Sequence, residues 1–238
     1  MDKKPTISVV YEDGNFVALS KPAGMLTHGI RNKELGIGET TVADWLLGNY
    51  PEVKIVGDNP NERPGIVHRL DKETSGILVV ARNQKAFEYL KKLFQEHKIR
   101  KTYLALVRGE VKKSGVIDAP IGLKPGTVRR SLKGNLKMVK EAITEYRPLK
   151  TIEKSGETFT LLELTPKTGR THQLRVHLAS IHHPVVGDGL YGRKSNPFSL
   201  DRMFLHASSI EFTVPNGTRL KLEADLPQDL EAVIDNQF

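Results

Sequence analysis

The chain has 238 residues, which at roughly 150 residues per domain corresponds to one large domain or two small ones. Hydrophobic residues make up 38% and charged residues 27%, a balance typical of a folded globular protein. The absence of cysteine excludes disulfides, thiolate metal sites and cysteine nucleophiles, and the net charge of +8 fits a polyanionic partner. Because the apolar runs are far shorter than the ~20 residues of a membrane span and MDKKPTISVV lacks the apolar stretch of a signal peptide, we expect a cytoplasmic protein with no membrane partner.

Short strands and a few helices follow one another along the chain. The strand candidates are Ile7–Tyr11, Phe16–Ser20, Ile77–Ala81, Thr102–Val107, Ala142–Leu149, Thr158–Thr165, Ser209–Val214 and Arg219–Ala224. Three pairs of strands are joined as antiparallel hairpins by the turn signals Asp13-Gly14, Ser155-Gly156 and Asn216-Gly217. The helix candidates are Thr41–Gly48, Asn83–His97, Thr171–His182 and Pro227–Asp235. This order predicts an α+β fold, with a mixed, mostly antiparallel sheet flanked by a few helices.

Positive charge is concentrated between Lys124 and Lys140 (KPGTVRRSLKGNLKMVK). This basic segment contains no acidic residue, and its six cations are Lys124, Arg129, Arg130, Lys133, Lys137 and Lys140. Gly126, Gly134 and Asn135 interrupt any helical or strand pattern, so we expect a mobile loop. Such a loop can wrap a phosphate backbone, although a solvated basic loop that binds nothing has the same composition.

A polar stretch leads into an apolar strand between Arg63 and Ala81 (RPGIVHRLDKETSGILVVA). Loops held by a rigid strand are common places for functional sites. Asp71 lies here beside His68 and Arg69, and a carboxylate kept ionised by cationic neighbours can act as a nucleophile or a base. The same aspartate can equally form a turn or a surface ion pair.

A second polar segment, Pro166–Gly192, begins at a turn and continues into a helix. The apolar stripe of that helix leaves His172 and Arg175, three residues apart, on the adjoining polar side. Five histidines lie between His172 and His206, which raises the alternative of a metal-dependent hydrolase. No HExxH or comparable ligand spacing is present, so we interpret them as hydrogen-bonding histidines and predict no metal site.

Five blocks of this sequence resemble the RluA-type family of RNA pseudouridine synthases. The blocks are VALSKPAGMLTH at Val17–His28, HRLDKETSGILVVA at His68–Ala81, KTYLALVRG at Lys101–Gly109, TGRTHQLRVHLA at Thr168–Ala179 and HPVVGDGLYG at His183–Gly192. A lone HRLD is weak evidence, whereas five matches in the family's order across nearly the whole chain are specific.

The resemblance implies isomerisation of specific uridines to pseudouridine in structured RNA, either ribosomal or transfer RNA. The bond from ribose to ring nitrogen N1 breaks, the uracil turns, and ring carbon C5 bonds to the same sugar carbon, so no cofactor is implied. The family's indispensable aspartate corresponds to Asp71. Its carboxylate can add to the sugar carbon, add to the ring or remove a sugar proton, and the sequence does not distinguish these routes.

The resemblance also assigns roles by motif position. Tyr103 corresponds to a tyrosine that stacks on the uracil with its hydroxyl near the C5 proton. Arg175 corresponds to a residue that pairs with the catalytic carboxylate, and Arg69 to one that fills the space left by the extruded base. The remaining predicted RNA contacts are His68, Arg170, His172 and Gln173, with Arg129, Arg130 and Lys133 of the basic segment.

We expect a single catalytic domain over 1–238, with a basic RNA-contacting insertion at about 123–141. Many members of the family have an N-terminal RNA-binding domain, which we expect this chain to lack. The resemblance further predicts a monomer whose partner is structured RNA, with no obligate protein partner. The alternative from a different class is a non-catalytic RNA-binding or RNA-chaperone protein on the same fold.

Overall fold

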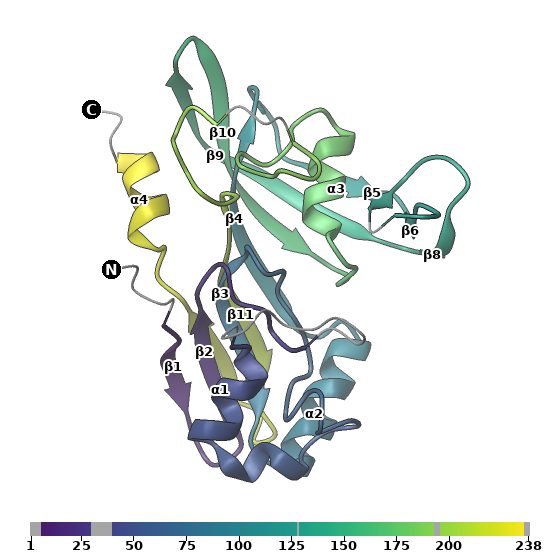
Figure 1. Ribbon diagram of the computed structural model, residues 1–238, viewed down its shortest axis with the longest axis vertical. Coiled ribbons are helices and arrows are strands. Elements are labelled where there is room, and N and C mark those ends of the chain that lie inside the picture. The colour runs from purple at the N-terminus through teal and green to yellow at the C-terminus, as the bar shows by residue number, and fades with distance from the viewer. Residues whose placement is uncertain (1–5, 30–39, 128, 193–195, 236–238) are drawn as a thin grey trace. The chain divides into compact units, whose positions relative to one another are not determined.

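The computed structural model describes residues 6–29, 40–127, 129–192 and 196–235. The chain divides into two compact units. Unit 1 contains the residues up to Ile99 together with Ala207–Asp225, and unit 2 contains Arg100–His206 together with the residues from Leu226 onward. Figure 1 labels strands and helices of both units where there is room. A single catalytic domain over 1–238 stays a prediction.

Unit 1 contains a sheet with the strand order β1-β2-β3-β11, and β12 pairs with β11. Its strands are β1 (Ser8–Glu12), β2 (Phe16–Lys21), β3 (Ser75–Ala81), β11 (Leu205–Thr213, of which Ala207 onward belongs to this unit) and β12 (Arg219–Glu223). Its helices are α1 (Val42–Asn49), the short 3₁₀ helix η1 (Pro51–Ile55) and α2 (Gln84–Gln95). The pairs β1–β2, β2–β3 and β11–β12 are antiparallel. All residues of β3 are buried, so this strand lies at the centre of the core of unit 1.

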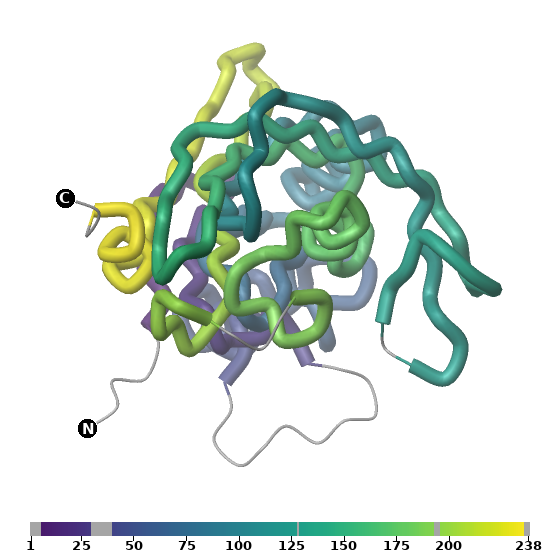
Figure 2. Tube along the Cα trace, turned by 90° about the horizontal axis from the view of Figure 1, so that it is seen from above, coloured from purple at the N-terminus to yellow at the C-terminus, as the bar shows by residue number. Residues whose placement is uncertain are grey.

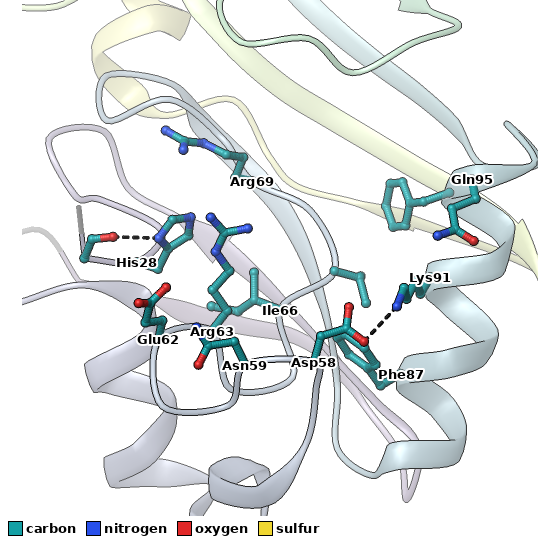
Figure 3. Close-up of a pocket in the computed structure, with 13 residues that line it drawn as sticks. His28, Asp58, Asn59, Glu62, Arg63, Ile66, Arg69, Phe87, Lys91 and Gln95 are labelled. Carbon is teal, nitrogen blue, oxygen red and sulfur yellow. Dashed lines mark hydrogen bonds and ion pairs between the residues drawn. The ribbon is translucent and has the colours of Figure 1, made fainter. Parts of the chain in front are cut away.

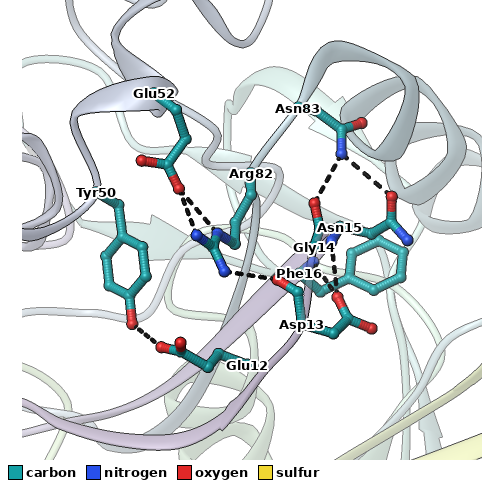
Figure 4. A network of polar contacts seen from close by, with 9 residues as sticks. All are labelled: Glu12, Asp13, Gly14, Asn15, Phe16, Tyr50, Glu52, Arg82 and Asn83. Atoms are coloured by element: carbon teal, nitrogen blue, oxygen red, sulfur yellow. Dashed lines mark hydrogen bonds and ion pairs between the residues drawn. The ribbon is translucent and has the colours of Figure 1, made fainter.

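The turn between β1 and β2 is held by hydrogen bonds from both sides (Figure 4). The Asp13 carboxylate accepts the backbone N–H groups of Asn15 and Phe16, each at 2.7 Å. From the residue after β3, the Arg82 guanidinium donates to the Asp13 carbonyl at 2.7 Å. The predicted Asp13-Gly14 hairpin is therefore confirmed, and the aspartate supplies the side-chain acceptor that such turns need.

Helix α2 packs its apolar side against β3. The Asn83 side chain accepts the Ala86 N–H at 2.9 Å and caps the helix, at the residue where the predicted helix Asn83–His97 begins. The buried residues of the helix recur at a spacing of three and four residues, which places them on one side: Ala86, Phe87, Leu90 and Leu93. This packing fixes α2 beside the strand that follows the Asp71 loop.

Unit 2 contains a sheet with the order β4-β10-β9-β5, in which every pairing is antiparallel. Its strands are β4 (Arg100–Arg108), β10 (Glu157–Pro166), β9 (Ile143–Lys154) and β5 (Gly115–Asp118), and its helices are α3 (Gln173–Ser180) and α4 (Gln228–Asp235). Side chains alternate between the two faces of a strand. The α3 face is formed by Ala105, Val107, Leu162, Leu164, Leu174 and Leu178. The opposite face packs against α4 and is formed by Leu106, Phe159, Leu161, Leu230 and Val233.

The basic segment is not the irregular loop that the sequence predicts. Strand β6 (Ile121–Leu123) pairs with β7 (Arg130–Ser131) and β8 (Lys137–Lys140), so a small three-stranded sheet forms. Figure 2 shows this part of the chain in teal, at the right of the view. Gly126 and Gly134 have φ angles of +70° and +95° and form turns between the strands, which is why their presence suggested a loop.

The other predicted elements agree with the structure. The four predicted helices and eight predicted strands are present within the described residues, and their ends differ by a few positions. The Ser155-Gly156 and Asn216-Gly217 hairpins are confirmed by the antiparallel pairs β9–β10 and β11–β12. The α+β class with a mostly antiparallel sheet is thus confirmed. Among the described residues, no helix combines the length and apolar character needed to cross a bilayer.

Candidate active site

The predicted catalytic residues are distributed over both units. Asp71 and Arg69 lie in unit 1, in the loop that precedes β3. Tyr103 lies on β4 and Arg175 on α3, both in unit 2. The pairing of Asp71 with Arg175 stays a prediction.

The loop that carries Asp71 is fixed by the segment that follows β2. The Thr27 hydroxyl donates to the Leu70 carbonyl at 3.0 Å and accepts the Leu70 N–H at 3.2 Å. On the other side of Asp71, the Lys72 carbonyl accepts the Gly24 N–H at 2.9 Å. The backbone is therefore held immediately before and after Asp71, whose own side chain is half-buried.

Lys21 lies at the centre of this arrangement, and its side chain is completely buried at the end of β2. Its ammonium group donates to the carbonyls of Pro22 and Met25, both at 2.8 Å, and to that of Lys72 at 3.2 Å. Removing a charge from water is costly, and charge-assisted hydrogen bonds to carbonyls offset that cost. Lys21 belongs to the VALSKPAGMLTH block, but sequence reasoning assigned it no role.

A glycine allows β3 to begin directly behind the Asp71 loop. Gly76 has a φ of +115°, and a Cβ atom at this position would lie 2.1 Å from the Ala207 carbonyl oxygen. No other residue type fits so close an approach to β11. The Asp71 carbonyl accepts the Thr74 N–H at 3.1 Å, which completes the turn into the strand.

His68 attaches the same loop to the body of unit 1. The Val79 N–H donates to its Nε2 at 3.0 Å. Its ring stacks on Phe94, with 4.8 Å between the ring centres. The imidazole thus has a structural role, and its contact with RNA stays a prediction. Arg69, the next residue, is exposed.

In unit 2, Arg175 forms a two-point ion pair with Asp188. Its Nε donates to one carboxylate oxygen at 2.7 Å and its Nη2 to the other at 2.8 Å. Asp188 is only 1% exposed and also accepts the backbone N–H groups of Leu190 and Tyr191 at 2.9 and 3.1 Å. Burial acts to raise the pKa of the Asp188 carboxyl, but the guanidinium and these N–H groups outweigh it and hold the pKa below its ordinary value. Asp188 therefore fixes the orientation of Arg175.

Tyr191 connects three of the predicted site residues. Its hydroxyl accepts the backbone N–H of Arg130 at 2.8 Å and lies 3.1 Å from Nδ1 of His172. The guanidinium carbon of Arg175 lies 5.2 Å from the centre of the same ring. His172 precedes α3 with a φ of +56°, a left-handed conformation that is uncommon for a residue other than glycine. One tyrosine thus joins the basic segment to the start of α3.

Gln173 organises the loop ahead of α3. Its carbonyl oxygen accepts the Thr168 hydroxyl at 2.7 Å and the Arg170 N–H at 3.0 Å. Its amide nitrogen donates to the Ile143 carbonyl and the Thr144 hydroxyl, each at 3.0 Å. These bonds use both N–H donors of the amide nitrogen and both lone pairs of the amide oxygen. We therefore assign Gln173 to positioning this loop, and any RNA contact would have to compete with these bonds.

Two cations lie near this loop on the α3 side of the sheet. Lys101 precedes Tyr103 by two residues, so both side chains point to the same face of β4. Burial, and to a smaller extent the charge of Arg170, lowers the pKa of Lys101 to about 8. Tyr103 is partly buried and packs against the α3 face. Lys101 is a further residue of this region to which the sequence blocks assigned no role.

The histidines of the 172–206 region serve separate hydrogen bonds. In the buried ring of His177, Nδ1 lies 2.9 Å from the Thr144 hydroxyl and Nε2 lies 3.0 Å from the Ala119 carbonyl. Nδ1 of His183 lies 2.7 Å from the Arg108 carbonyl. The hydrogen-bonding interpretation is confirmed for these two residues. Within the described ranges, no three His, Asp or Glu side chains form a group that could hold a metal ion.

Comparison with known proteins shows extensive similarity. A family model described as RNA pseudouridylate synthase matches residues 15–180. The chain is 39% identical over 236 residues to "Ribosomal large subunit pseudouridine synthase D" of Nitrosomonas europaea, a match that covers 96% of this chain and 64% of that relative. This chain therefore spans less than two thirds of the length of that relative.

A shorter curated relative and a solved structure match over most of both chains. "tRNA pseudouridine synthase C" of Vibrio parahaemolyticus is 34% identical over 224 residues, covering 88% of this chain and 85% of that protein. The solved structure titled "Human RNA Pseudouridylate Synthase Domain Containing 1" has a TM-score of 0.76 and 28% sequence identity, covering 98% of this chain and 90% of the other.

Replacing Lys21 by methionine removes the ammonium group and keeps an unbranched side chain of similar length. Because three carbonyls around a fully buried position lose their charged donor, we expect the free energy of unfolding to fall by about 3 kcal/mol in urea titrations. The matched control is Lys54→Met, at an exposed lysine of η1, for which we expect a change below about 0.5 kcal/mol. Equal, small effects of the two substitutions would contradict the role given to Lys21.

Replacing Asp188 by asparagine keeps the shape of the side chain and removes the charge that faces Arg175. Loss of one partner of a buried ion pair typically costs about 3–5 kcal/mol, so we expect a loss of stability of about 3 kcal/mol at pH 7. The folded-state pKa lies below the ordinary value of 3.8, so this contribution is present above about pH 4 and is lost as the pH falls through the folded-state pKa. The wild type and Asp188→Asn should therefore converge in acid, and a stability difference that stays constant down to pH 2 would refute this assignment.

Proposed function

Because this chain belongs to the RNA pseudouridylate synthase family, we propose that it isomerises specific uridines to pseudouridine in structured RNA. The observation that carries the proposal is the Asp71 loop inside the matched range, held by hydrogen bonds on both sides of the aspartate. The names of the relatives refer to large-subunit ribosomal RNA and to tRNA, and both are candidate substrates of this chain. We propose that it acts in the cytoplasm as a monomer, without a cofactor or a protein partner.

The isomerisation conserves every atom of the nucleotide. The bond between N1 and the sugar carbon C1′ breaks, the uracil turns, and C5 bonds to C1′. A proton leaves C5 and N1 ends with a proton. The protein must therefore supply a group that acts on the nucleotide, a group near the C5 proton, and cations that hold the RNA.

We assign the first of these functions to the carboxylate of Asp71. It can add to C1′, add to the ring or remove a sugar proton, and each route needs an ionised carboxylate at a fixed position. The hydrogen bonds of Leu70 and Lys72 support this assignment, because a fixed backbone reduces the entropy lost on reaching the transition state. Arg69 is exposed two residues earlier in the same loop, and we propose that it occupies the space left by the extruded uridine.

Tyr103 and Arg175 are assigned to the nucleotide and to the carboxylate, respectively. Tyr103 lies on the α3 face of the unit 2 sheet, where its ring can stack on uracil and its hydroxyl can lie near C5. The two-point pair with Asp188 supports a fixed guanidinium at Arg175, which we propose as the cationic partner of the Asp71 carboxylate. The bonds of His172 and Gln173 support a role for both in placing α3 and the loop before it.

The basic segment is proposed to bind the phosphate backbone through Arg129, Arg130 and Lys133. Arg129 and Lys133 are exposed, and Tyr191 holds the Arg130 backbone. The small sheet supports this proposal, because Arg130 lies on the paired strand β7 and a cation on a paired strand loses less conformational entropy on binding than one on an irregular loop. Arg129 precedes this strand directly, and Lys133 lies two residues beyond its end. A non-catalytic RNA-binding protein would share this segment, so only turnover separates the two functions.

Replacing Asp71 by asparagine should abolish the reaction and leave RNA binding nearly intact. We expect pseudouridine in unmodified rRNA and tRNA transcripts, detected by carbodiimide labelling and primer extension, to fall by at least about 1,000-fold, with RNA affinity within about twofold of the wild type. The matched control is Glu73→Gln, an exposed carboxylate two residues further along the loop, which should retain activity. Product formed by Asp71→Asn would refute the mechanism. Wild-type protein that binds RNA without forming product would favour the RNA-chaperone alternative.

Replacing Arg129, Arg130 and Lys133 together by glutamine should weaken RNA binding and its dependence on salt. Loss of three phosphate contacts lowers the slope of log affinity against log salt concentration by about 2, which filter binding at several salt concentrations measures. The charge-matched control replaces Lys112, Lys113 and Lys154, three exposed lysines of unit 2, by glutamine. If both triple variants show the same slope of log affinity against log salt concentration, the basic segment does not bind RNA and is a solvated surface.

A further inference from the structure

A cavity of about 610 Å³ lies in unit 1 beside the loop that carries Arg69 (Figure 3). Its lining comes from the residues that follow β2, from the 58–69 segment and from α2. Ligand pockets have volumes of about 300–1,000 Å³, so its size suits a small organic group. Asp71 is not among the residues that line it.

One end of the cavity is cationic. The guanidinium groups of Arg63 and Arg69 and the ring of His28 gather there (Figure 3). Burial, and to a smaller extent the charges of Arg63 and Arg69, lowers the pKa of His28, so both guanidiniums lie close enough to act on the ring. Glu62 lies at the same end and offsets one of the two arginine charges. A net positive charge remains, which favours an anionic group.

The rest of the cavity has a different character. Its floor includes the buried side chains of Ile66 and Phe87. At the far end from the arginines, Lys91 and Asp58 form an ion pair of 2.7 Å (Figure 3). Asn59 also lines the cavity and offers an amide that can both donate and accept hydrogen bonds. An apolar floor with neighbouring amides suits a nucleobase, which has flat faces and polar edges.

We propose that this cavity binds a nucleotide adjacent to the target uridine, with its phosphate at Arg63 in the cationic end and its base on the apolar floor. This inference rests on the proposed function. Arg69 and Asp71 are two residues apart, a separation of at most about 7 Å along the chain. RNA that places a uridine at Asp71 therefore has its neighbouring nucleotides within reach of the cavity, which Arg69 lines. An acidic peptide or a free phosphate has no nucleobase to place on the apolar floor, so either of these alternative ligands would bind at the cationic end alone.

The first test compares Arg63→Gln with Lys85→Gln, which removes the same charge from an exposed position of α2 outside the cavity. On a transcript that the wild type modifies, we expect Arg63→Gln to raise KM about fivefold with kcat within twofold, and to lower the salt slope of binding by about 0.7. Lys85→Gln should have the same KM, kcat and salt slope of binding as the wild type. Equal behaviour of the two variants, while the wild type forms product, overturns the inference and leaves the proposed function intact.

The second test locates the RNA directly. Gln95 lines the cavity and is exposed, so Gln95→p-benzoylphenylalanine places a photoreactive group at the rim. We expect crosslinks at nucleotides directly adjacent to the modified uridine, and none there from Glu88→p-benzoylphenylalanine, an exposed position of α2 outside the cavity. Crosslinks from both positions, or only at distant nucleotides, overturn the inference. If the wild type forms no product, the proposed function fails, and the crosslinks still report whether RNA enters the cavity.

Discussion

The geometry of the candidate site depends on the hydrogen bonds of one buried ammonium group, that of Lys21. The group joins the end of β2, the turn that follows and the Asp71 loop, since its acceptors are the carbonyls of Pro22, Met25 and Lys72. A catalytic carboxylate must stay within a fraction of an ångström of its working position, and a loop without secondary structure does not ensure this by itself. The hydrogen bond from Lys21 helps to hold the loop, because moving the loop away would take the Lys72 carbonyl from the acceptors of a fully buried ammonium group.

In unit 2 a guanidinium group, that of Arg175, is likewise held in place by a buried acceptor. Asp188 is buried and its carboxylate forms a two-point ion pair with Arg175, so the orientation of this guanidinium is fixed within the unit. Tyr191 extends the arrangement to the basic segment by accepting the Arg130 N–H. Cations placed in advance in this way bind a polyanion with less loss of conformational entropy, which is the contribution that the proposed function assigns to them.

Local signals in the sequence were sufficient for much of the fold, whereas the site residues were assigned by motif resemblance and stay predictions. Asp13 at a hairpin turn and Asn83 at a helix start act through neighbours within three residues, so pattern reasoning found both. Strands β6, β7 and β8 were not predicted, because runs of two to four residues are too short to show the alternation of polar and apolar residues that marks a strand. The glycines in the turns between them suggested an irregular loop. The structural role of Lys21 was not predicted, because one of its acceptors is 51 residues away and spacing along the chain does not reveal such a partner.

The central claim is that a uridine in cellular RNA is isomerised by the carboxylate at position 71. The most direct measurement is a transcriptome-wide map of pseudouridine in three strains, which carry the wild-type gene, a deletion, or the deletion complemented with an Asp71→Asn allele expressed at the same level. The account predicts that one or more sites in ribosomal or transfer RNA disappear in the deletion strain and do not return with the Asp71→Asn allele. Sites that return in full with that allele, or a map that is unchanged by the deletion, would contradict it.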